Sequence, residues 1–249
     1  MKAIIIAAGS STRLSNLTKN LPKGLLDINS KTILERQLSI FNKNHITEII
    51  LITGPLSDNF TFQNVQIVKD LNYKKHEVLG SLMAARKYFF DELIVSYSDI
   101  LFDENILSQV IDFKGDIGIA VDLNWEQAYE GRTEHPREQA DNVVINDGQI
   151  LKIKKNISSD IDTETIGEFI GLIKFSKTGS KIWLDEYEKL EKNNRGNFQD
   201  APSFEEAYIT DMIQQLIDRK INVSPIIVSG KWCEIDTPQD LNRARILFP

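Results

Sequence analysis

The chain has 249 residues, of which 41% are hydrophobic and 26% are charged, and its formal net charge at pH 7 is −7. A chain of this length and composition can bury a full core, and one compact domain over residues 1–249 is the economical interpretation. The negative charge argues against a protein that wraps nucleic acid or docks on anionic lipid, because both depend on a dense cationic surface, and a small ligand fits better.

Apolar, β-branched runs alternate with helix-like or loop segments along the first half of the chain. The expected strands are residues 2–8, 48–53, 65–70, 92–99 and 116–122. Between them, residues 32–42 and 79–90 place apolar side chains on one helical stripe. This alternation predicts an α/β fold with a Rossmann-like, doubly wound sheet that is mixed, mostly parallel and flanked by helices.

The pattern changes after Asp122. Residues 125–140 are polar and irregular, which predicts a functional loop that overhangs the site. Asp147-Gly148 predicts a hairpin turn within residues 142–154. The remaining expected elements are a strand at 168–175, helices at 177–193 and 203–219 with a loop at 193–202 between them, strands at 223–228 and 232–235 that close the sheet, and a final helix that begins at Thr237-Pro238.

Cys233 is the only cysteine, so it can form no internal disulfide and has no second thiol to complete a zinc cluster. The N-terminal apolar run is too short to cross a bilayer and lacks the pattern of a signal peptide. We therefore expect a cytoplasmic protein that does not insert in a membrane.

A loop of small residues follows the first expected strand, and Arg13 comes directly after it. The loop consists of Ala7, Ala8, Gly9, Ser10, Ser11 and Thr12. Its backbone N–H groups can approach a polyphosphate, and Arg13 can grip one bidentately, although an ordinary tight turn is the alternative. Further along, Leu21-Pro22-Lys23 supplies a lysine that can neutralise phosphate charge.

Together these two motifs resemble the nucleotidyltransferase family that makes nucleoside diphosphate-sugars and CDP-alcohols. The signature of that family is a strand, A-A-G-x-x-[ST]-R-[LM], a short gap and then P-K. The resemblance implies a GT-A-like nucleotidyltransferase fold in which residues 7–13 bind the nucleotide. It also implies that Arg13 and Lys23 stabilise the triphosphate and the charge that develops during transfer.

Two aspartates match the acidic metal ligands that the resemblance implies. Asp99 stands at the end of the strand at 92–99, and Asp236 lies in E-I-D-T-P-Q-D-L, which resembles the closing motif of the family. Both are expected to hold Mg²⁺ against the α-phosphate and to complete a catalytic set with Arg13 and Lys23. For Asp99, capping of the next helix is the alternative. Asp240 is expected to stabilise the first turn of the last helix.

The resemblance also suggests a nucleobase pocket and a donor. Thr53, Gly54, Gly80 and Ser81 stand at positions that line this pocket in relatives, although Gly80 and Ser81 could equally begin a helix. The order of the motifs and the compact size look most like the phosphocholine cytidylyltransferase branch, which favours CTP.

The acceptor-binding residues are expected after residue 121. Residues 122–125, 129–132 and 135–140 resemble a stretch of cytidylyltransferases that activate phosphonates such as 2-aminoethylphosphonate. The candidates are Arg132, His135 and Lys154 for phosphonate oxygens, Asp122, Trp125 and Tyr129 for an ammonium group, and Glu168 for orienting the acceptor or a metal-bound water. The alternative is that the aromatic residues only pack the loop, His135 is a surface histidine and Glu168 pairs with a neighbouring cation.

The leading hypothesis is a Mg²⁺-dependent cytidylyltransferase that transfers CMP from CTP to a small phosphonate or to phosphocholine and releases pyrophosphate. Residues 1–122 would form the nucleotide-binding half, and residues 123–249 the acceptor-binding half with the closing helices. The alternatives are a sugar-1-phosphate nucleotidyltransferase and a non-catalytic nucleotide-sensing module, against which the presence of all four predicted catalytic residues argues. The sequence leaves open whether the protein forms a homodimer.

Overall fold

The computed structural model describes residues 1–9, 14, 18, 21–157 and 163–249. The predicted nucleotide contacts Ser10, Ser11, Thr12 and Arg13 therefore lie outside the described residues. None of the helices in the described ranges is long and apolar enough to cross a membrane.

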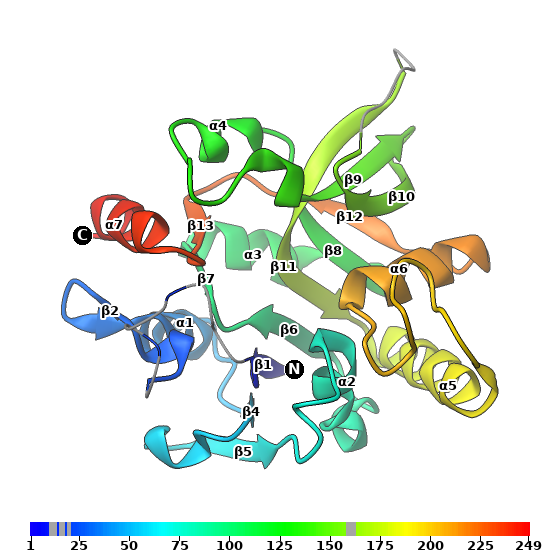
Figure 1. The fold of residues 1–249 in the computed structure, drawn as a ribbon, viewed down its shortest axis with the longest axis horizontal. Helices are drawn as coiled ribbons and strands as arrows, with labels where there is room; N and C mark the ends of the chain where they lie inside the picture. Colours follow the sequence, from blue (N-terminus) through cyan, green and yellow to red (C-terminus); the bar gives the residue numbers. More distant parts are fainter. Residues whose placement is uncertain (10–13, 15–17, 19–20, 158–162) are drawn as a thin grey trace.

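Nine of the described strands form one mixed sheet (Figure 1). The path along this sheet is β10 (Gln149–Lys155), β9 (Asp141–Asn146), β11 (Thr165–Phe175), β6 (Leu93–Tyr97), β1 (Lys2–Ala7), β4 (Ile49–Thr53) and β5 (Val65–Lys69). β8 (Ile117–Asp122) pairs with β11 and with β12 (Ser224–Ile227). The neighbours from β6 to β5 run parallel, whereas β11 runs antiparallel to β6, β8 and β9. The predicted fold class is confirmed.

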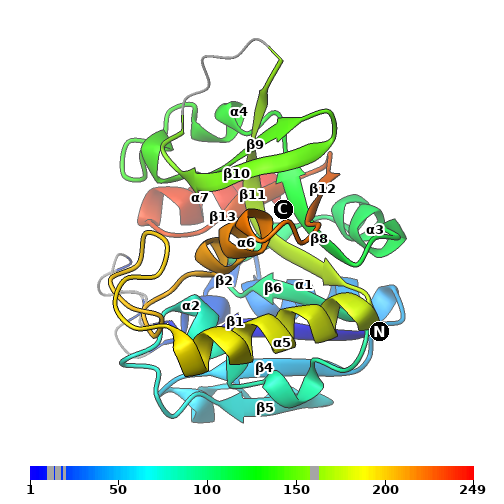
Figure 2. The ribbon, with the colours of Figure 1, turned by 90° about the vertical axis from the view of Figure 1, so that its right-hand side faces the viewer.

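Helices cover both faces of this sheet. Those on one face are α1 (Ile33–Lys43) and α3 (Glu104–Asp112), and those on the other are α2 (Val78–Met83), α5 (Lys177–Asn193) and α6 (Ile209–Asp218). The helices α4 (Glu126–Tyr129) and α7 (Pro238–Leu247) pack in two smaller clusters. Alternate residues of β1 point to opposite faces, so that Ile4 and Ile6 pack with α2, α5 and α6, whereas Ala3 and Ile5 pack with α1 and α3. Figure 2 shows α5 lying across one face.

A smaller core joins the two ends of the chain beside the sheet. There β2 (Asp27–Ile28) pairs with β3 (Lys31–Thr32), and β7 (Ile100–Phe102) pairs with β13 (Trp232–Glu234). Ile28, Leu101, Ile235 and Leu241 meet in this core under α7. The prediction that residues 232–235 close the main sheet is thus wrong, because β13 pairs with β7 in a separate two-stranded ribbon.

Two predicted helices begin or end differently in the structure. The helix expected at residues 79–90 ends at Met83, after which Ala84, Ala85, Tyr88 and Phe89 donate to carbonyls three residues back in tighter turns. The helix expected from residue 203 begins only at Ile209.

The late start of α6 has a tertiary cause. The carbonyls of Glu205 and Ala207 accept hydrogen bonds from the N–H groups of Glu77 and Leu79, which hold this segment against the start of α2. The Ser203 hydroxyl does accept from the Glu206 N–H at 3.3 Å, but this hydrogen bond closes an isolated turn and does not start a helix. The other predicted helices and the hairpin are confirmed, with Asp147 and Gly148 at positive φ in its turn.

We expect Gly179→Ala to destabilise the fold by about 3 kcal/mol, because a Cβ atom at Gly179 would lie 1.9 Å from the Asp116 carbonyl oxygen. Chemical denaturation followed by circular dichroism measures this change. Thr178→Ala, on the exposed side of the same helical turn, is the matched control. Equal stability of the two variants would contradict the packing described here.

Candidate active site

The site lies where the parallel strand order of the sheet reverses. Along the sheet, β5, β4, β1 and β6 follow one another, so the connections from β1 and from β6 leave in different directions. In open α/β sheets such a switch point leaves a crevice at the carboxyl ends of the strands. Here Ala7 ends β1 and is followed by Ala8 and Gly9, and Ser98 and Asp99 follow β6.

Lys23 lies between the two predicted metal carboxylates. Its Nζ donates to Asp99 Oδ2 at 2.9 Å and to Asp236 Oδ1 at 2.5 Å. Burial lowers the pKa of Lys23, but the charges of Asp99 and Asp236 outweigh that effect and raise it above its usual value. Asp99 and Asp236, which lie 76 and 213 positions after Lys23 in the sequence, thus form one charged cluster with it.

Backbone contacts bring the two aspartates together. The Ile235 N–H donates to the Asp99 carbonyl at 2.9 Å, directly beyond the paired strands β7 and β13. The next residue after Lys23, Gly24, packs tightly against Leu34, where a Cβ atom would lie 2.8 Å from Leu34 Cγ. This close packing brings Lys23 up to the two aspartates. Close packing and strand pairing therefore fix a cluster that no local sequence pattern contains.

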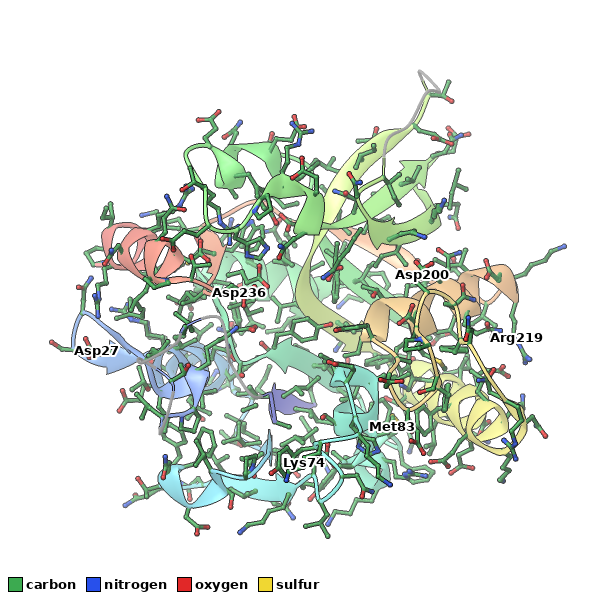
Figure 3. All side chains as sticks on the ribbon, in the orientation of Figure 1. Asp27, Lys74, Met83, Asp200, Arg219 and Asp236 are labelled. Atoms are coloured by element: carbon green, nitrogen blue, oxygen red, sulfur yellow. The ribbon has the colours of Figure 1, made fainter. Side chains whose placement is uncertain are left out.

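A cavity of about 670 Å³ opens beside this cluster. Its wall includes Ala7, Ala8, Gly9, Lys23, Ser81, Asp99 and Asp236. Asp236 and Lys74, both labelled in Figure 3, line it from different sides. Small-molecule sites commonly have volumes of roughly 300–1,000 Å³, so the cavity can hold a nucleotide.

The residues around this cavity fit a hard divalent cation such as Mg²⁺. Asp99 and Asp236 present carboxylate oxygens, and Asp99 Oδ1 is buried with no hydrogen-bond partner among the described residues. Glu234 lies close by, where burial and the charges of Asp236 and Asp99 raise its pKa well above the usual value. Excess negative charge in a half-enclosed crevice favours a bound cation.

Three of the predicted nucleobase residues do not line this cavity. Thr53 is fully buried beside Ala7 in the sheet, and a Cβ atom at Gly54 would lie 2.7 Å from the Ala8 carbonyl oxygen. A Cβ atom at Gly80 would lie 2.6 Å from the His76 ring. These residues support the cavity wall from behind, and Ser81 is the one of the four that reaches the wall.

Sequence reasoning missed part of the wall of the large cavity. This part includes Tyr73, Lys74, His76, Tyr97 and Tyr208. Buried Asp70 anchors it, since Ser81 Oγ donates to Asp70 Oδ2 at 2.9 Å and His76 Nδ1 lies 3.2 Å from both carboxylate oxygens. In the sequence, only His76 and Ser81, which stand five residues apart on either side of the start of α2, could have indicated this part of the wall.

The segment at residues 125–140 lies against α7 rather than over the large cavity. Arg132 Nε donates to Asp240 Oδ1 at 2.8 Å, and its guanidinium lies 4.7 Å from the centre of the Tyr129 ring. Trp125 and Tyr129 are buried in a small cluster with Ala140. The predicted cradle of Asp122, Trp125 and Tyr129 does not form, because both rings pack the segment and Asp122 accepts from Trp232 Nε1.

Lys154 lies apart from the other candidates. Its Nζ pairs with Asp200 at 2.8 Å, to the right of Asp236 in Figure 3. His135 and Glu168, by contrast, line a smaller cavity whose wall also includes Tyr97 and Asp236. Asp240 closes the capping box of α7 with Thr237, as expected.

The comparisons with known proteins agree with this geometry. A family model described as the MobA-like NTP transferase domain matches residues 3–131. The chain is 29% identical over 254 residues to the CTP:phosphoglutamine cytidylyltransferase of Campylobacter jejuni, covering 97% of this chain and 98% of that protein. It is 32% identical over 106 residues to the choline-phosphate cytidylyltransferase of Streptococcus pneumoniae, covering 41% of this chain and 46% of that protein.

A solved structure of the CTP:phosphocholine cytidylyltransferase from Streptococcus pneumoniae has the same fold. Its TM-score is 0.74 at 21% sequence identity, and the match covers 100% of this chain and 99% of that one. The family match takes in β1, Lys23 and Asp99, which are elements of the site described above. The chain therefore belongs to the MobA-like NTP transferase domain family and is a nucleotidyltransferase, as its two N-terminal motifs indicated.

Proposed function

We propose that this protein is a Mg²⁺-dependent cytidylyltransferase that transfers CMP from CTP to a small phosphorylated or phosphonylated acceptor and releases pyrophosphate. The observation that carries the proposal is the cluster in which Lys23 lies between Asp99 and Asp236 at the edge of the large cavity. A nucleotide-sensing module would not need such a metal-binding cluster.

The donor is proposed from the relatives. One relative that aligns with nearly the whole chain, from Campylobacter jejuni, is named for CTP and phosphoglutamine. Another, which aligns with part of the chain, is named for choline phosphate. Both names describe cytidylyl transfer to a non-sugar acceptor, which supports CTP as the donor and a compact acceptor.

The chemistry follows from the residues of the cluster. An acceptor oxygen would attack the α-phosphorus of CTP in line, the bond to the bridging oxygen would break, and pyrophosphate would leave with the electron pair. Lys23 would neutralise charge on the leaving pyrophosphate, and the backbone at residues 7–9 would hold the phosphates. Mg²⁺ held by Asp99 and Asp236 would supply charge neutralisation at the α-phosphate.

The test measures pyrophosphate release with each of CTP, UTP, GTP and ATP. Each donor is paired with phosphoglutamine, phosphocholine, 2-aminoethylphosphonate and glucose 1-phosphate in the presence of Mg²⁺. We expect release to be fastest with CTP and a non-sugar acceptor, by about tenfold or more over the other donors. Chelation of the metal should stop the reaction, and added Mg²⁺ should restore it.

Reactions without acceptor give the background of this assay. Absence of pyrophosphate release with every pairing would refute the proposed activity. Fastest release with glucose 1-phosphate would instead assign the protein to sugar activation.

A further inference from the structure

Three side chains of the kinds that bind metal ions meet at Asp236. His135, Glu234 and Asp236 each offer one ligand atom, and these three atoms all lie within 4.8 Å of one another. Asp236 faces His135 with Oδ2, whereas its Oδ1 accepts from Lys23. The two oxygens of this carboxylate thus contact different groups, and the group around Oδ2 is distinct from the pair of aspartates that Lys23 joins.

The distances in this group match those between ligand atoms on one metal ion. His135 Nδ1 lies 3.2 Å from Asp236 Oδ2 and 3.8 Å from Glu234 Oε2. Ligand atoms that are each roughly 2.0–2.2 Å from a shared ion lie about 3–4 Å apart at ordinary coordination angles. The group can therefore take up an ion with only small movements of its side chains.

His135 is buried without a hydrogen bond at Nδ1. The residue is 3% exposed, so the alternative of a surface histidine is wrong, and Nδ1 makes no hydrogen bond to any of the described residues. Nδ1 is near enough to Asp236 Oδ2 for a hydrogen bond, but the direction of a ring N–H does not allow one. The Tyr129 ring packs edge-on against the imidazole, with 6.0 Å between the ring centres. A neutral imidazole with its proton on Nε2 offers the Nδ1 lone pair to a cation at this place.

The cations around Glu234 do not form hydrogen bonds with it. Arg132 Nη2 lies 4.0 Å from Glu234 Oε2, and Arg132 Nε donates to Asp240 instead. The described residues in the wall of the smaller cavity include four carboxyl groups and one lysine, namely Asp141, Glu168, Glu234, Asp236 and Lys155. Buried carboxylates in such excess are stabilised when they coordinate a metal ion.

An ion can reach this group from solvent. The side chain of Glu234 is 28% exposed. Glu234 also lies in the walls of two cavities, the smaller one and another of about 760 Å³ beside α7. The group is therefore accessible through Glu234, although His135 and Asp236 are buried.

The types of the ligand atoms decide which ions fit. Mg²⁺ prefers oxygen ligands and keeps several waters, whereas an imidazole nitrogen suits Zn²⁺ and other first-row transition metals. Three protein ligands also leave a coordination position for water or for an oxygen atom of a bound molecule.

We infer that His135, Glu234 and Asp236 form a site for a divalent transition-metal ion that binds Zn²⁺ more tightly than Mn²⁺. This site is separate from the one proposed for Mg²⁺ at Asp99 and Asp236 Oδ1. The ion joins the segment at residues 125–140 to the end of β13, two parts of the chain that are far apart in the sequence. The inference concerns metal binding alone, so it does not rest on the proposed function.

Titration calorimetry of the metal-free protein with Zn²⁺ and, separately, with Mg²⁺ tests this site. We expect the wild type to bind Zn²⁺ about 100-fold more tightly than Mg²⁺. His135→Asn replaces the ligand nitrogen with an amide. It should bind Zn²⁺ about 100-fold less tightly than the wild type does, and Mg²⁺ within about threefold of the wild type. His45→Asn is the matched control, because His45 is exposed and asparagine tolerates its φ of 61°.

Two further variants separate the two metal sites. Glu234→Gln removes another ligand and should lose affinity for Zn²⁺ as His135→Asn does. Asp99→Asn, by contrast, should weaken the binding of Mg²⁺ and leave that of Zn²⁺ within about threefold of the wild type. Co²⁺ in place of Zn²⁺ should give the wild type a visible absorption band that His135→Asn lacks. Thermal midpoints of the metal-free variants establish that they are folded.

Equal affinity of the wild type for Zn²⁺ and Mg²⁺ would overturn the inference. Unchanged affinity for Zn²⁺ in His135→Asn or in Glu234→Gln would also overturn it and would leave the group as an ion pair of His135 with the carboxylates. Parallel loss of both ions in Asp99→Asn would show that they share one site. Pyrophosphate release measures the proposed function in a separate assay, so each of the two can fail while the other holds.

Discussion

Asp236→Asn is expected to lower kcat for cytidylyl transfer by about three orders of magnitude, with a much smaller change in the affinity for CTP. Asp236 Oδ1 accepts from Lys23 at 2.5 Å, and Asp236 is 2% exposed. Asparagine keeps the shape of the side chain but removes the charge that would hold Mg²⁺ and that balances Lys23. Initial rates of pyrophosphate release and calorimetric titration with CTP separate the two effects.

The matched control for this variant is Asp185→Asn, which removes one carboxylate from the exposed face of α5. It should keep the wild-type rate. The thermal midpoint of Asp236→Asn shows whether the fold is intact. A folded Asp236→Asn protein with a rate near that of the wild type would exclude Asp236 from the metal site.

Lys23→Met is expected to lower kcat/KM by about a thousandfold, because the ammonium group that would neutralise the leaving pyrophosphate is lost. The same change leaves two carboxylates without the cation between them, at a cost of about 2–3 kcal/mol of stability in the absence of metal. Added Mg²⁺ should therefore raise the thermal midpoint of Lys23→Met more than that of the wild type. Pyrophosphate release and scanning fluorimetry with and without Mg²⁺ measure both effects.

Lys181→Met, on the exposed surface of α5, controls for the loss of one positive charge. It should change neither rate nor midpoint. An equal response of Lys23→Met and wild type to Mg²⁺ would show that Lys23 and the cation do not share the two carboxylates.

The sequence was sufficient for the fold class and for the core of the site. Strong apolar periodicity marks buried strands, and the chain order of those strands predicts where their carboxyl ends meet. Motif resemblance named Lys23, Asp99 and Asp236, and the structure brings them together. What these residues do stays a prediction until the variants are measured.

The acceptor side could not be predicted in the same way. The contact of Tyr129 with Glu168 joins residues 39 positions apart, and that of Arg132 with Asp240 joins residues 108 positions apart. Local patterns contain no information about such pairs. The position of Lys154 could not be predicted either. It depends on a register shift in the hairpin between Ile150 and Lys152, and on an ion pair with Asp200.

The hydrogen bond from the Ile235 N–H to the Asp99 carbonyl has a consequence for the order in which the protein matures. A nascent chain that has emerged from the ribosome as far as residue 230 contains β1, β6, Asp99 and the other wall residues of the large cavity apart from Asp236. It lacks Asp236, which becomes part of the site only when β13 has paired with β7 and α7 has folded over the small core beside it. On the proposed mechanism, the growing polypeptide stays catalytically silent until the residues of β13 and α7 have been made and have folded.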